Sequence, residues 1–355
     1  MSSEPFCIVE TSPNGRYQRY DEKLGEGSSK KVWKAFDTED GRIVAWNCAK
    51  YEPLDSEDES KVKNEILILK TLRHPHIITL YDFWHDPKNH RFCFITDIMT
   101  DGTLRDFMGK VGQVNLSVIK NWSRQILSAL HYLHSRSPPV IHRDLKCYNI
   151  FVSSATGTIR IGDFGLSALK EDDYLSGMVG TPEFMAPEIF NERYTEKVDT
   201  YAFGMCLLEM VTGVTPYEEC LNNPYKVWKA IKNGVKPQSL GHIKDLTVAS
   251  IIEICLQDEV QRPTAEDLIA MPFFHTLCPE DSNPVELEAL IPNERPVSPQ
   301  AGTEPLSPDT LSPDTLSPDT LSPNALSQPE PDPKTQQREQ EAQRLEEKIL
   351  ANWSL

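Results

Sequence analysis

The sequence predicts an α+β fold of two lobes, a small β-rich lobe over about residues 15–99 and a larger helical lobe over about residues 100–275. Two observations support this division. The first part contains runs in which apolar residues alternate with polar ones, as they do along strands. Beyond about residue 103, apolar residues recur at the three-to-four spacing of helices. A cleft between two such lobes is a common place for a ligand.

In the small lobe, residues 18–36 and 41–50 are predicted strands. Asp40-Gly41 lies between them, and this dipeptide is typical of a hairpin turn. Residues 91–98 are a further predicted strand.

Residues 56–72 are a predicted helix, because Val62, Ile66 and Leu69 fall on one helical face. In the larger lobe, helices are predicted over residues 117–136 and 197–213.

The folded region is expected to lie between two tails. Residues 1–14 are read as an N-terminal tail. Residues 276–333 are rich in proline, serine and acidic residues and contain three tandem LSPDT repeats, a composition that predicts a disordered linker. Residues 334–355 are predicted to form an amphipathic helix, with Leu345, Ile349 and Trp353 on one face, which is a candidate partner-binding element.

Composition excludes several classes of protein. The formal net charge of −17 over 355 residues argues against non-specific binding to nucleic acid or to an anionic membrane surface. The eight cysteines are scattered without a CxxC pair, which fits a reducing compartment, and we expect a cytoplasmic protein. The most apolar run, residues 201–214, is too short to span a bilayer.

Three short motifs carry the functional signal. They are His142-Arg143-Asp144-Leu145-Lys146-Cys147-Tyr148-Asn149, then Asp163-Phe164-Gly165, then Ala186-Pro187-Glu188. In this order and spacing they resemble the eukaryotic protein kinase family, whose bilobal fold agrees with the predicted lobes. The resemblance covers about residues 15–275 and implies transfer of the γ-phosphate of ATP to a protein hydroxyl.

The resemblance assigns a role to each polar residue of these motifs. Asp144 would accept the proton of the substrate hydroxyl, and Lys146 would reach the γ-phosphate. Asn149 and Asp163 would bind Mg²⁺ through hard oxygen ligands. Three further residues are expected to support the fold: Glu188 and Arg262 as an ion pair, and Asp199 as an anchor of the catalytic loop.

The serine/threonine specificity is indicated by Lys146 within LKxxN and by the downstream motif Gly180-Thr181-Pro182-Glu183. Thr181 is expected to hydrogen-bond near Asp144 and to set the substrate-binding loop. Ser176 is the candidate activating phosphosite, with Arg143 as the partner of the added phosphate.

The nucleotide end departs from the usual kinase pattern. The strand motif VAxK reads Val44-Ala45-Trp46-Asn47, and asparagine cannot form the ion pair with the helix glutamate, which we assign to Glu65. The expected ATP-binding residues are otherwise present: Gly25, Gly27, Val32, Ala45, Glu65, Thr96 and Met99.

Strand alternation identifies a replacement lysine. Val32 is expected to cover the adenine, and Lys30 lies two residues before it, so Lys30 faces the cleft and Lys31 faces outward. Lys50 lies five residues beyond Ala45, an odd step, and therefore points away from the cleft. A Lys30 ammonium group is thus placed to reach both the phosphates and Glu65.

This arrangement resembles the With-No-Lysine (WNK) kinases, in which the lysine is moved to the glycine-rich loop. The matching stretches are GEGSSKKVWKAFD, VAWN, GTPEFMAPE and YAFGMCLLEM. Two features differ from that family: Phe164 replaces the leucine of the chloride pocket, so chloride sensing is not implied, and Gly177 occupies the position of the activating serine, one residue after Ser176.

Two alternatives remain open on the sequence. One is a nucleotide-binding pseudokinase scaffold that acts through its partners, and the other is an ordinary kinase that uses Lys50. The expected partner is a protein substrate, with a downstream kinase among the candidates. Neither a nucleic acid nor a membrane span is expected.

Overall fold

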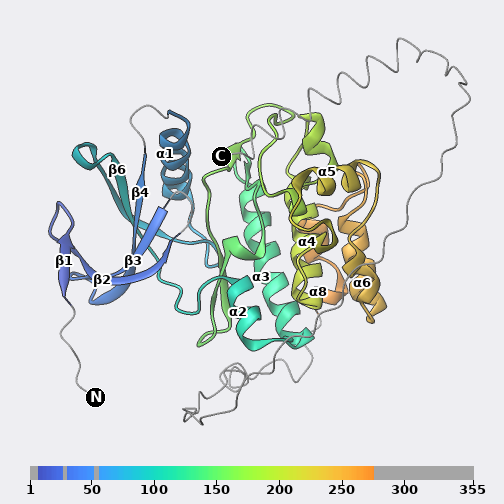
Figure 1. The fold of residues 1–355 in the computed structure, drawn as a ribbon, viewed down its shortest axis with the longest axis horizontal. Helices are drawn as coiled ribbons and strands as arrows, with labels where there is room; N and C mark the ends of the chain where they lie inside the picture. Colours follow the sequence, from blue (N-terminus) through green and yellow to red (C-terminus); the bar gives the residue numbers. More distant parts are fainter. Residues whose placement is uncertain (1–6, 27–29, 52–55, 276–355) are drawn as a thin grey trace, which may run out of the picture. The chain divides into compact units, whose positions relative to one another are not determined.

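The computed structural model describes residues 7–26, 30–51 and 56–275. These residues form a β-rich N-lobe and a helical C-lobe (Figure 1). The predicted linker and amphipathic helix lie outside the described residues. No helix in the described ranges is long and apolar enough to cross a membrane.

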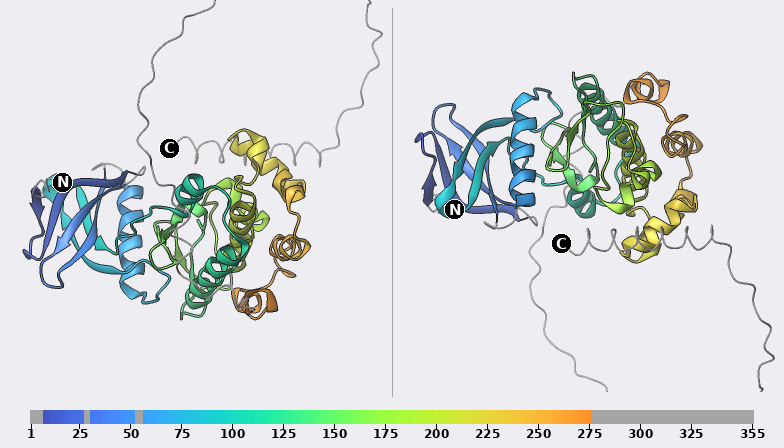
Figure 2. Two further views of the ribbon diagram at one scale, coloured as in Figure 1. Left: turned by 90° about the horizontal axis from the view of Figure 1, so that it is seen from below. Right: turned by 90° about the horizontal axis from the view of Figure 1, so that it is seen from above.

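The N-lobe is a curled antiparallel sheet of six strands in the order β1-β2-β3-β4-β6-β5, with one helix against it (Figure 2). The strands are β1 (Ile8–Thr11), β2 (Tyr17–Glu26), β3 (Lys30–Asp37), β4 (Arg42–Lys50), β5 (Leu80–Asp86) and β6 (Arg91–Thr96), and the helix is α1 (Ser56–Thr71). The predicted segment 18–36 corresponds to two strands, β2 and β3, whereas the predictions 41–50, 91–98 and 56–72 agree with β4, β6 and α1 to within a few residues.

Two strands differ from the sequence prediction. β1 lies inside the predicted N-terminal tail of residues 1–14, where it pairs with β2. β5 pairs with β6 and was not predicted. β1 is short and its side chains are largely exposed, so it has little of the alternation that identifies a strand.

The outer face of the sheet holds an apolar core. It consists of Tyr17, Ala35, Val44, Trp46, Cys48, Cys93 and Ile95, with Trp33, Tyr81 and Trp84 packed against it. Because side chains alternate along β4, the neighbours of these core residues point to the opposite face, toward the C-lobe.

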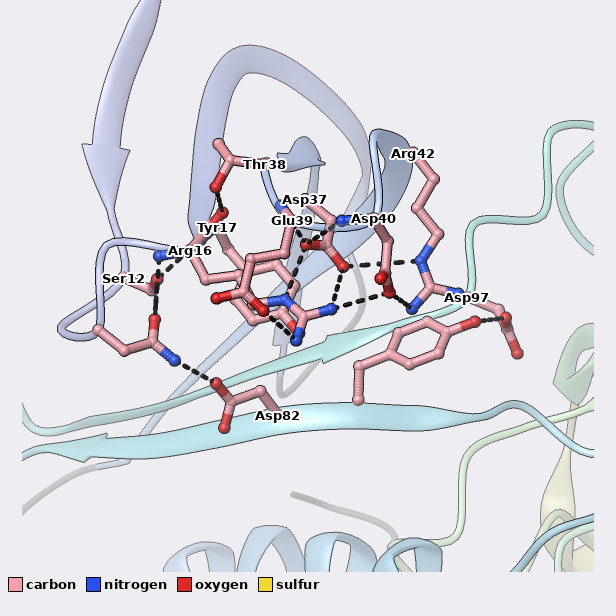
Figure 3. A network of polar contacts seen from close by, with 12 residues as sticks. Ser12, Arg16, Tyr17, Asp37, Thr38, Glu39, Asp40, Arg42, Asp82 and Asp97 are labelled. Atoms are coloured by element: carbon pink, nitrogen blue, oxygen red, sulfur yellow. Dashed lines mark hydrogen bonds and ion pairs between the residues drawn. The ribbon is translucent and has the colours of Figure 1, made fainter.

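Arg16 fixes the hairpin that joins β3 and β4 (Figure 3). Its Nε donates to Asp37 Oδ1 at 2.7 Å and its Nη2 donates to Asp40 Oδ2 at 2.8 Å. The hydrogen bond from Arg16 lowers the pKa of Asp37 to about 2, although burial opposes the shift. The turn thereby sets an unbroken β3–β4 register that pairs Lys30 with Ala49 and Val32 with Asn47.

The C-lobe contains the helices α2 (Leu104–Val111), α3 (Leu116–His134), α4 (Lys197–Thr212), α5 (Pro224–Lys232), α6 (Leu246–Cys255), α7 (Ala265–Ile269) and α8 (Pro272–His275). The lobe also contains two small antiparallel sheets of two strands each, β7 (Val140–Ile141) with β10 (Ala168–Leu169) and β8 (Ile150–Ser153) with β9 (Thr158–Ile161). The predicted helices 117–136 and 197–213 correspond to α3 and α4.

Two buried polar contacts hold the functional loops to this lobe, as expected. Arg262 donates through two nitrogens to both carboxylate oxygens of Glu188, and its side chain is fully buried. Asp199, on α4, accepts the backbone N–H groups of His142 and Arg143 at 2.8 and 2.9 Å. The loop that carries Asp144 is therefore anchored to the central helix of the C-lobe.

Candidate active site

Asp144 is the centre of a dense hydrogen-bond network. Thr181 Oγ1 donates to Asp144 Oδ1 at 2.7 Å, and Asn149 Nδ2 donates to Asp144 Oδ2 at 2.9 Å. Lys146 Nζ lies 2.9 Å from Asp144 Oδ2 and donates to Thr181 Oγ1 at 2.6 Å. Four residues that the sequence analysis selected thus meet, and the expected contact between Thr181 and Asp144 is present.

Gly180 lets the substrate-side segment approach the catalytic loop closely. It has a φ of +117°, and a Cβ at this position would come within 2.5 Å of the Arg143 carbonyl oxygen. Any larger residue would therefore displace Thr181 from Asp144.

Asp163 projects into the cleft from a strained position. Its φ of +64° lies in the left-handed region, which is costly for a residue with a Cβ. The charge of Lys30 lowers the pKa of Asp163, although burial opposes the shift. Its side chain is 44% exposed and so stays available to a ligand.

Asn149 and Asp163 fit a divalent metal ion. The Asn149 amide nitrogen donates to both the carbonyl oxygen and Oδ2 of Asp144, so the amide oxygen is left as a ligand. An amide oxygen and an ionised carboxylate are the hard oxygen ligands that Mg²⁺ prefers.

Lys30 joins the N-lobe to the segment that carries Asp163. Its Nζ donates to Glu65 Oε1 at 2.7 Å and lies 3.6 Å from Asp163 Oδ1. Burial opposes the charge on Lys30, but the Glu65 and Asp163 carboxylates outweigh burial and raise its pKa above the ordinary value. Burial raises the pKa of Glu65, an effect that Lys30 counteracts. We conclude that Lys30 is an ammonium ion held between two carboxylates.

Asn47 occupies the usual position of the lysine and turns its amide into the sheet. Its Nδ2 donates to Thr96 Oγ1 at 2.9 Å and to the Phe94 carbonyl at 3.3 Å. The side chain is 6% exposed. Asn47 therefore fills the space beside Thr96 without supplying charge, a role that the sequence analysis did not identify.

The other two candidate lysines lie outside the cleft. Lys31 forms an exposed ion pair with Glu26 at 2.7 Å. Lys50 is exposed at the end of β4, opposite Arg91 of β6. Of the three lysines, the structure brings only Lys30 to Glu65.

The remaining predicted nucleotide residues are distributed around the cleft. Ala45 and Thr96 are buried, and Val32 and Met99 are half-buried. Gly25 belongs to β2, and Gly27 lies outside the described residues. Met99 and the exposed Leu24 line a cavity of about 1410 Å³ that extends along α2 but is not lined by Lys30, Asp144 or Asp163. Leu24 was missed, although it lies directly before Gly25.

The regulatory residues are connected through a tyrosine. Arg143 Nε donates to the Leu166 carbonyl at 2.6 Å, and its Nη1 donates to Tyr194 Oη at 3.2 Å. Tyr194 Oη in turn lies 3.1 Å from the Ser176 carbonyl oxygen. Ser176 itself is exposed, and its phosphorylation stays a prediction. No sequence motif singled out Tyr194.

Phe164, the residue after Asp163, packs inside the protein. It is fully buried, and its ring makes an edge contact with the His142 ring at 4.9 Å between centroids.

Comparison with known proteins finds a matching family and several similar sequences. The family model described as protein kinase domain matches residues 18–274. The chain is 47% identical over 274 residues to serine/threonine-protein kinase WNK8 of Arabidopsis thaliana, which covers 77% of this chain and 48% of the relative. It is 42% identical to serine/threonine-protein kinase WNK of Caenorhabditis elegans over 79% of this chain and 15% of the relative. It is 43% identical to human serine/threonine-protein kinase WNK4 over 75% of this chain and 22% of the relative. The chain thus spans about half the length of the plant relative and less of the two animal relatives.

Proposed function

Because the chain belongs to the protein kinase family, we propose that it transfers the γ-phosphate of ATP to serine or threonine residues of protein substrates, with Lys30 as its nucleotide-binding lysine. The observation that carries the proposal is the position of Lys30 Nζ, 2.7 Å from Glu65 and 3.6 Å from Asp163. The identities of 42–47% to With-No-Lysine serine/threonine kinases support the same reading.

Each residue of the site has its own role in phosphoryl transfer. Asp144 orients the substrate hydroxyl and receives its proton, while Thr181 fixes the Asp144 carboxylate in place. Lys146, between Asp144 and Thr181, is placed to neutralise charge on the transferred phosphoryl group. Lys30 compensates charge on the other phosphates from the opposite wall.

Asn149 and Asp163 would hold the divalent cation, which we propose to be Mg²⁺. When bound, such an ion neutralises phosphate charge and polarises the group that is transferred.

The complete set of Asp144, Asn149, Asp163 and Lys30 favours an active enzyme over a pseudokinase scaffold, because a scaffold requires none of these groups in catalytic geometry. The protein substrate, for which a downstream kinase is a candidate, is recognised by surfaces outside this set. The scattered free cysteines favour a cytoplasmic location.

The proposal is tested by removing each candidate lysine in turn. Lys30→Met should lose nearly all ATP-dependent phosphorylation of a generic protein substrate, because an ion contact in a partly desolvated cleft is worth about 4 kcal/mol at an effective dielectric constant near 20. The matched variants Lys31→Met and Lys50→Met should stay within a few-fold of the unmodified chain.

A rescue variant makes the test sharper. Lys30→Gly combined with Asn47→Lys moves the ammonium group to the usual strand position and should recover part of the lost activity. Near-normal turnover in Lys30→Met, together with loss of activity in Lys50→Met, would assign the role to Lys50. An unmodified chain that binds ATP but transfers no phosphate would instead favour the scaffold.

A further inference from the structure

Two cysteines face each other across neighbouring strands of the N-lobe. Cys48 on β4 pairs directly with Cys93 on β6, and both side chains belong to the outer core of the sheet. Directly opposed residues of antiparallel strands have Cα atoms about 4.5 or 5.5 Å apart. Both spacings lie within the range of roughly 4.4–6.8 Å that a disulfide spans. The strand register therefore places the two thiols where they can be joined without moving the backbone.

Cys48 has the properties of the attacking thiol. Arg91 Nη1 lies 3.9 Å from Cys48 Sγ, and a nearby guanidinium group stabilises a thiolate. The hydrogen bond from Cys93, supported by the charge of Arg91, lowers the pKa of Cys48 to about 7 against the effect of burial. The same hydrogen bond raises the pKa of Cys93. The contact with Arg91 distinguishes the two thiols, and it assigns Cys48 as the nucleophile and Cys93 as its resolving partner.

A small hollow lies beside Arg91, the residue that contacts Cys48. Its volume is about 320 Å³, and its lining includes Arg91, Glu10 and Trp84. Arg91 contacts Cys48, and Trp84 on β5 is the strand neighbour of Cys93. A molecule as small as hydrogen peroxide fits this hollow, next to the arginine that contacts Cys48.

We propose that Cys48 and Cys93 are a peroxide-sensitive dithiol that closes to an intramolecular disulfide between β4 and β6. The Cys48 thiolate attacks one oxygen of hydrogen peroxide, the O–O bond breaks, and Cys48 sulfenic acid and hydroxide form. The Cys93 sulfur then attacks the Cys48 sulfur and gives up its proton, and the hydroxyl group leaves as water. Two thiols are oxidised by two electrons in all, and one peroxide is reduced to two waters.

A second cysteine pair provides an internal comparison. Cys147 Sγ donates to the backbone carbonyl of Cys206 at 3.9 Å, and both residues are fully buried. Burial raises the pKa of Cys147 well above its ordinary value, so it stays a thiol. Both pairs bring two cysteines close together, whereas only Cys48 has an arginine in contact with its sulfur among the described residues of the two pairs.

The experiment is disulfide mapping of the full chain. The protein is treated with hydrogen peroxide, alkylated under denaturing conditions, digested and analysed by mass spectrometry. We expect a Cys48–Cys93 linked peptide that dithiothreitol removes, with Cys147 and Cys206 alkylated. Alkylated Cys48 and Cys93 under conditions that oxidise the exposed Cys7 would overturn the proposal, and so would a link from either residue to another cysteine.

Two variants test the assigned roles. Arg91→Gln should slow formation of the link about three-fold or more, because Cys48 loses its cationic neighbour. The matched control is Arg19→Gln, which also breaks an ion pair with Glu10 but should leave the rate unchanged. Equal rates in both variants would contradict the role of Arg91. In Cys93→Ser, dimedone should trap a sulfenic acid at Cys48; should that variant fail to fold, the mapping of the unmodified chain decides.

Discussion

At the scale of single residues, the site consists of lysine side chains that each lie next to a carboxylate. Lys30 compensates Glu65 and Asp163 from the N-lobe, and Lys146 lies beside Asp144 on the C-lobe. Asn47 adds no charge and satisfies its amide within the sheet. Lys30 and Lys146 therefore each contact a carboxylate in the structure. Bound phosphates would add further negative charge next to these ammonium groups.

Asp144 is the residue whose removal should affect the chemical step most. In Asp144→Asn, the shape of the side chain is retained but the negative oxygen that accepts the substrate proton is lost. We expect a rate loss of three orders of magnitude or more, which corresponds to about 4 kcal/mol. The measurement is single-turnover phosphorylation, with the exposed Asp172→Asn as a control expected to be neutral. Turnover close to that of the unmodified chain would exclude Asp144 as the proton acceptor.

At the scale of elements, the segment from Asp163 to Glu188 is held at several points. Ala168 of β10 pairs with Ile141 of β7, directly before the catalytic loop. Further along, Leu175 forms an isolated bridge with Tyr194, whose hydroxyl donates to the Ser176 and Gly177 carbonyl oxygens. The position of Thr181 thus depends on contacts made on both sides of Ser176.

Phosphorylation of Ser176 should strengthen this arrangement. Tyr194 already links Arg143 to the Ser176 backbone, so a phosphate on the exposed Ser176 side chain would add charge close to a cation of the catalytic loop, next to Asp144 in the sequence. We expect Ser176→Ala to lower activity about ten-fold or more in enzyme that has been allowed to phosphorylate itself. Tyr174→Phe on the same segment is the control. Phosphosite mapping of active enzyme that shows Ser176 unmodified would exclude this mechanism.

At the scale of the whole described molecule, polar and aromatic contacts outside the site also join the N-lobe to the C-lobe. Asn64 of α1 donates to the Ser167 carbonyl at 2.7 Å. Beyond the end of α1, His74 stacks on Tyr132 of α3 at 5.0 Å between centroids and lies 3.2 Å from Ser128 Oγ. The connection that follows α1 is therefore packed against the longest helix of the C-lobe.

The His74 contact predicts a dependence of stability on pH. Burial, together with the neighbouring His76, lowers the pKa of His74 from 6.5 to about 4. Between these values the unfolded chain binds more protons than the folded one, so stability present above pH 6.5 is lost as the pH falls toward 4. The melting temperature should decrease over this interval, and His74→Asn should reduce the decrease. The exposed His242→Asn is the control, and an unchanged profile in His74→Asn would refute the assignment.

Much of the active site is readable from the sequence, because the signals involved are local. The catalytic loop is a contiguous motif, so Asp144, Lys146 and Asn149 are identified without knowledge of the fold. The face of Lys30 follows from the period of two along a strand, which is a property of the backbone alone. The hairpin at Asp40-Gly41 and the helix 56–72 follow from turn chemistry and helical spacing in the same way. β1 and β5 show a weaker alternation of apolar and polar residues, and they are identified as strands only by their pairing with β2 and β6.

The tertiary structure decided the contacts between groups that are distant along the chain. Lys30 and Glu65 are 35 residues apart, and their separation of 2.7 Å depends on how α1 packs beside the sheet. The orientation of the Asn47 amide toward the sheet depends on its hydrogen bond to Thr96 of the neighbouring strand β6. The opposition of Cys48 and Cys93 requires the β4–β6 register. The sequence determines which side chains each segment carries and on which face of a strand or helix they lie. The distances between segments follow from tertiary packing, because each of these contacts joins residues that are far apart along the chain.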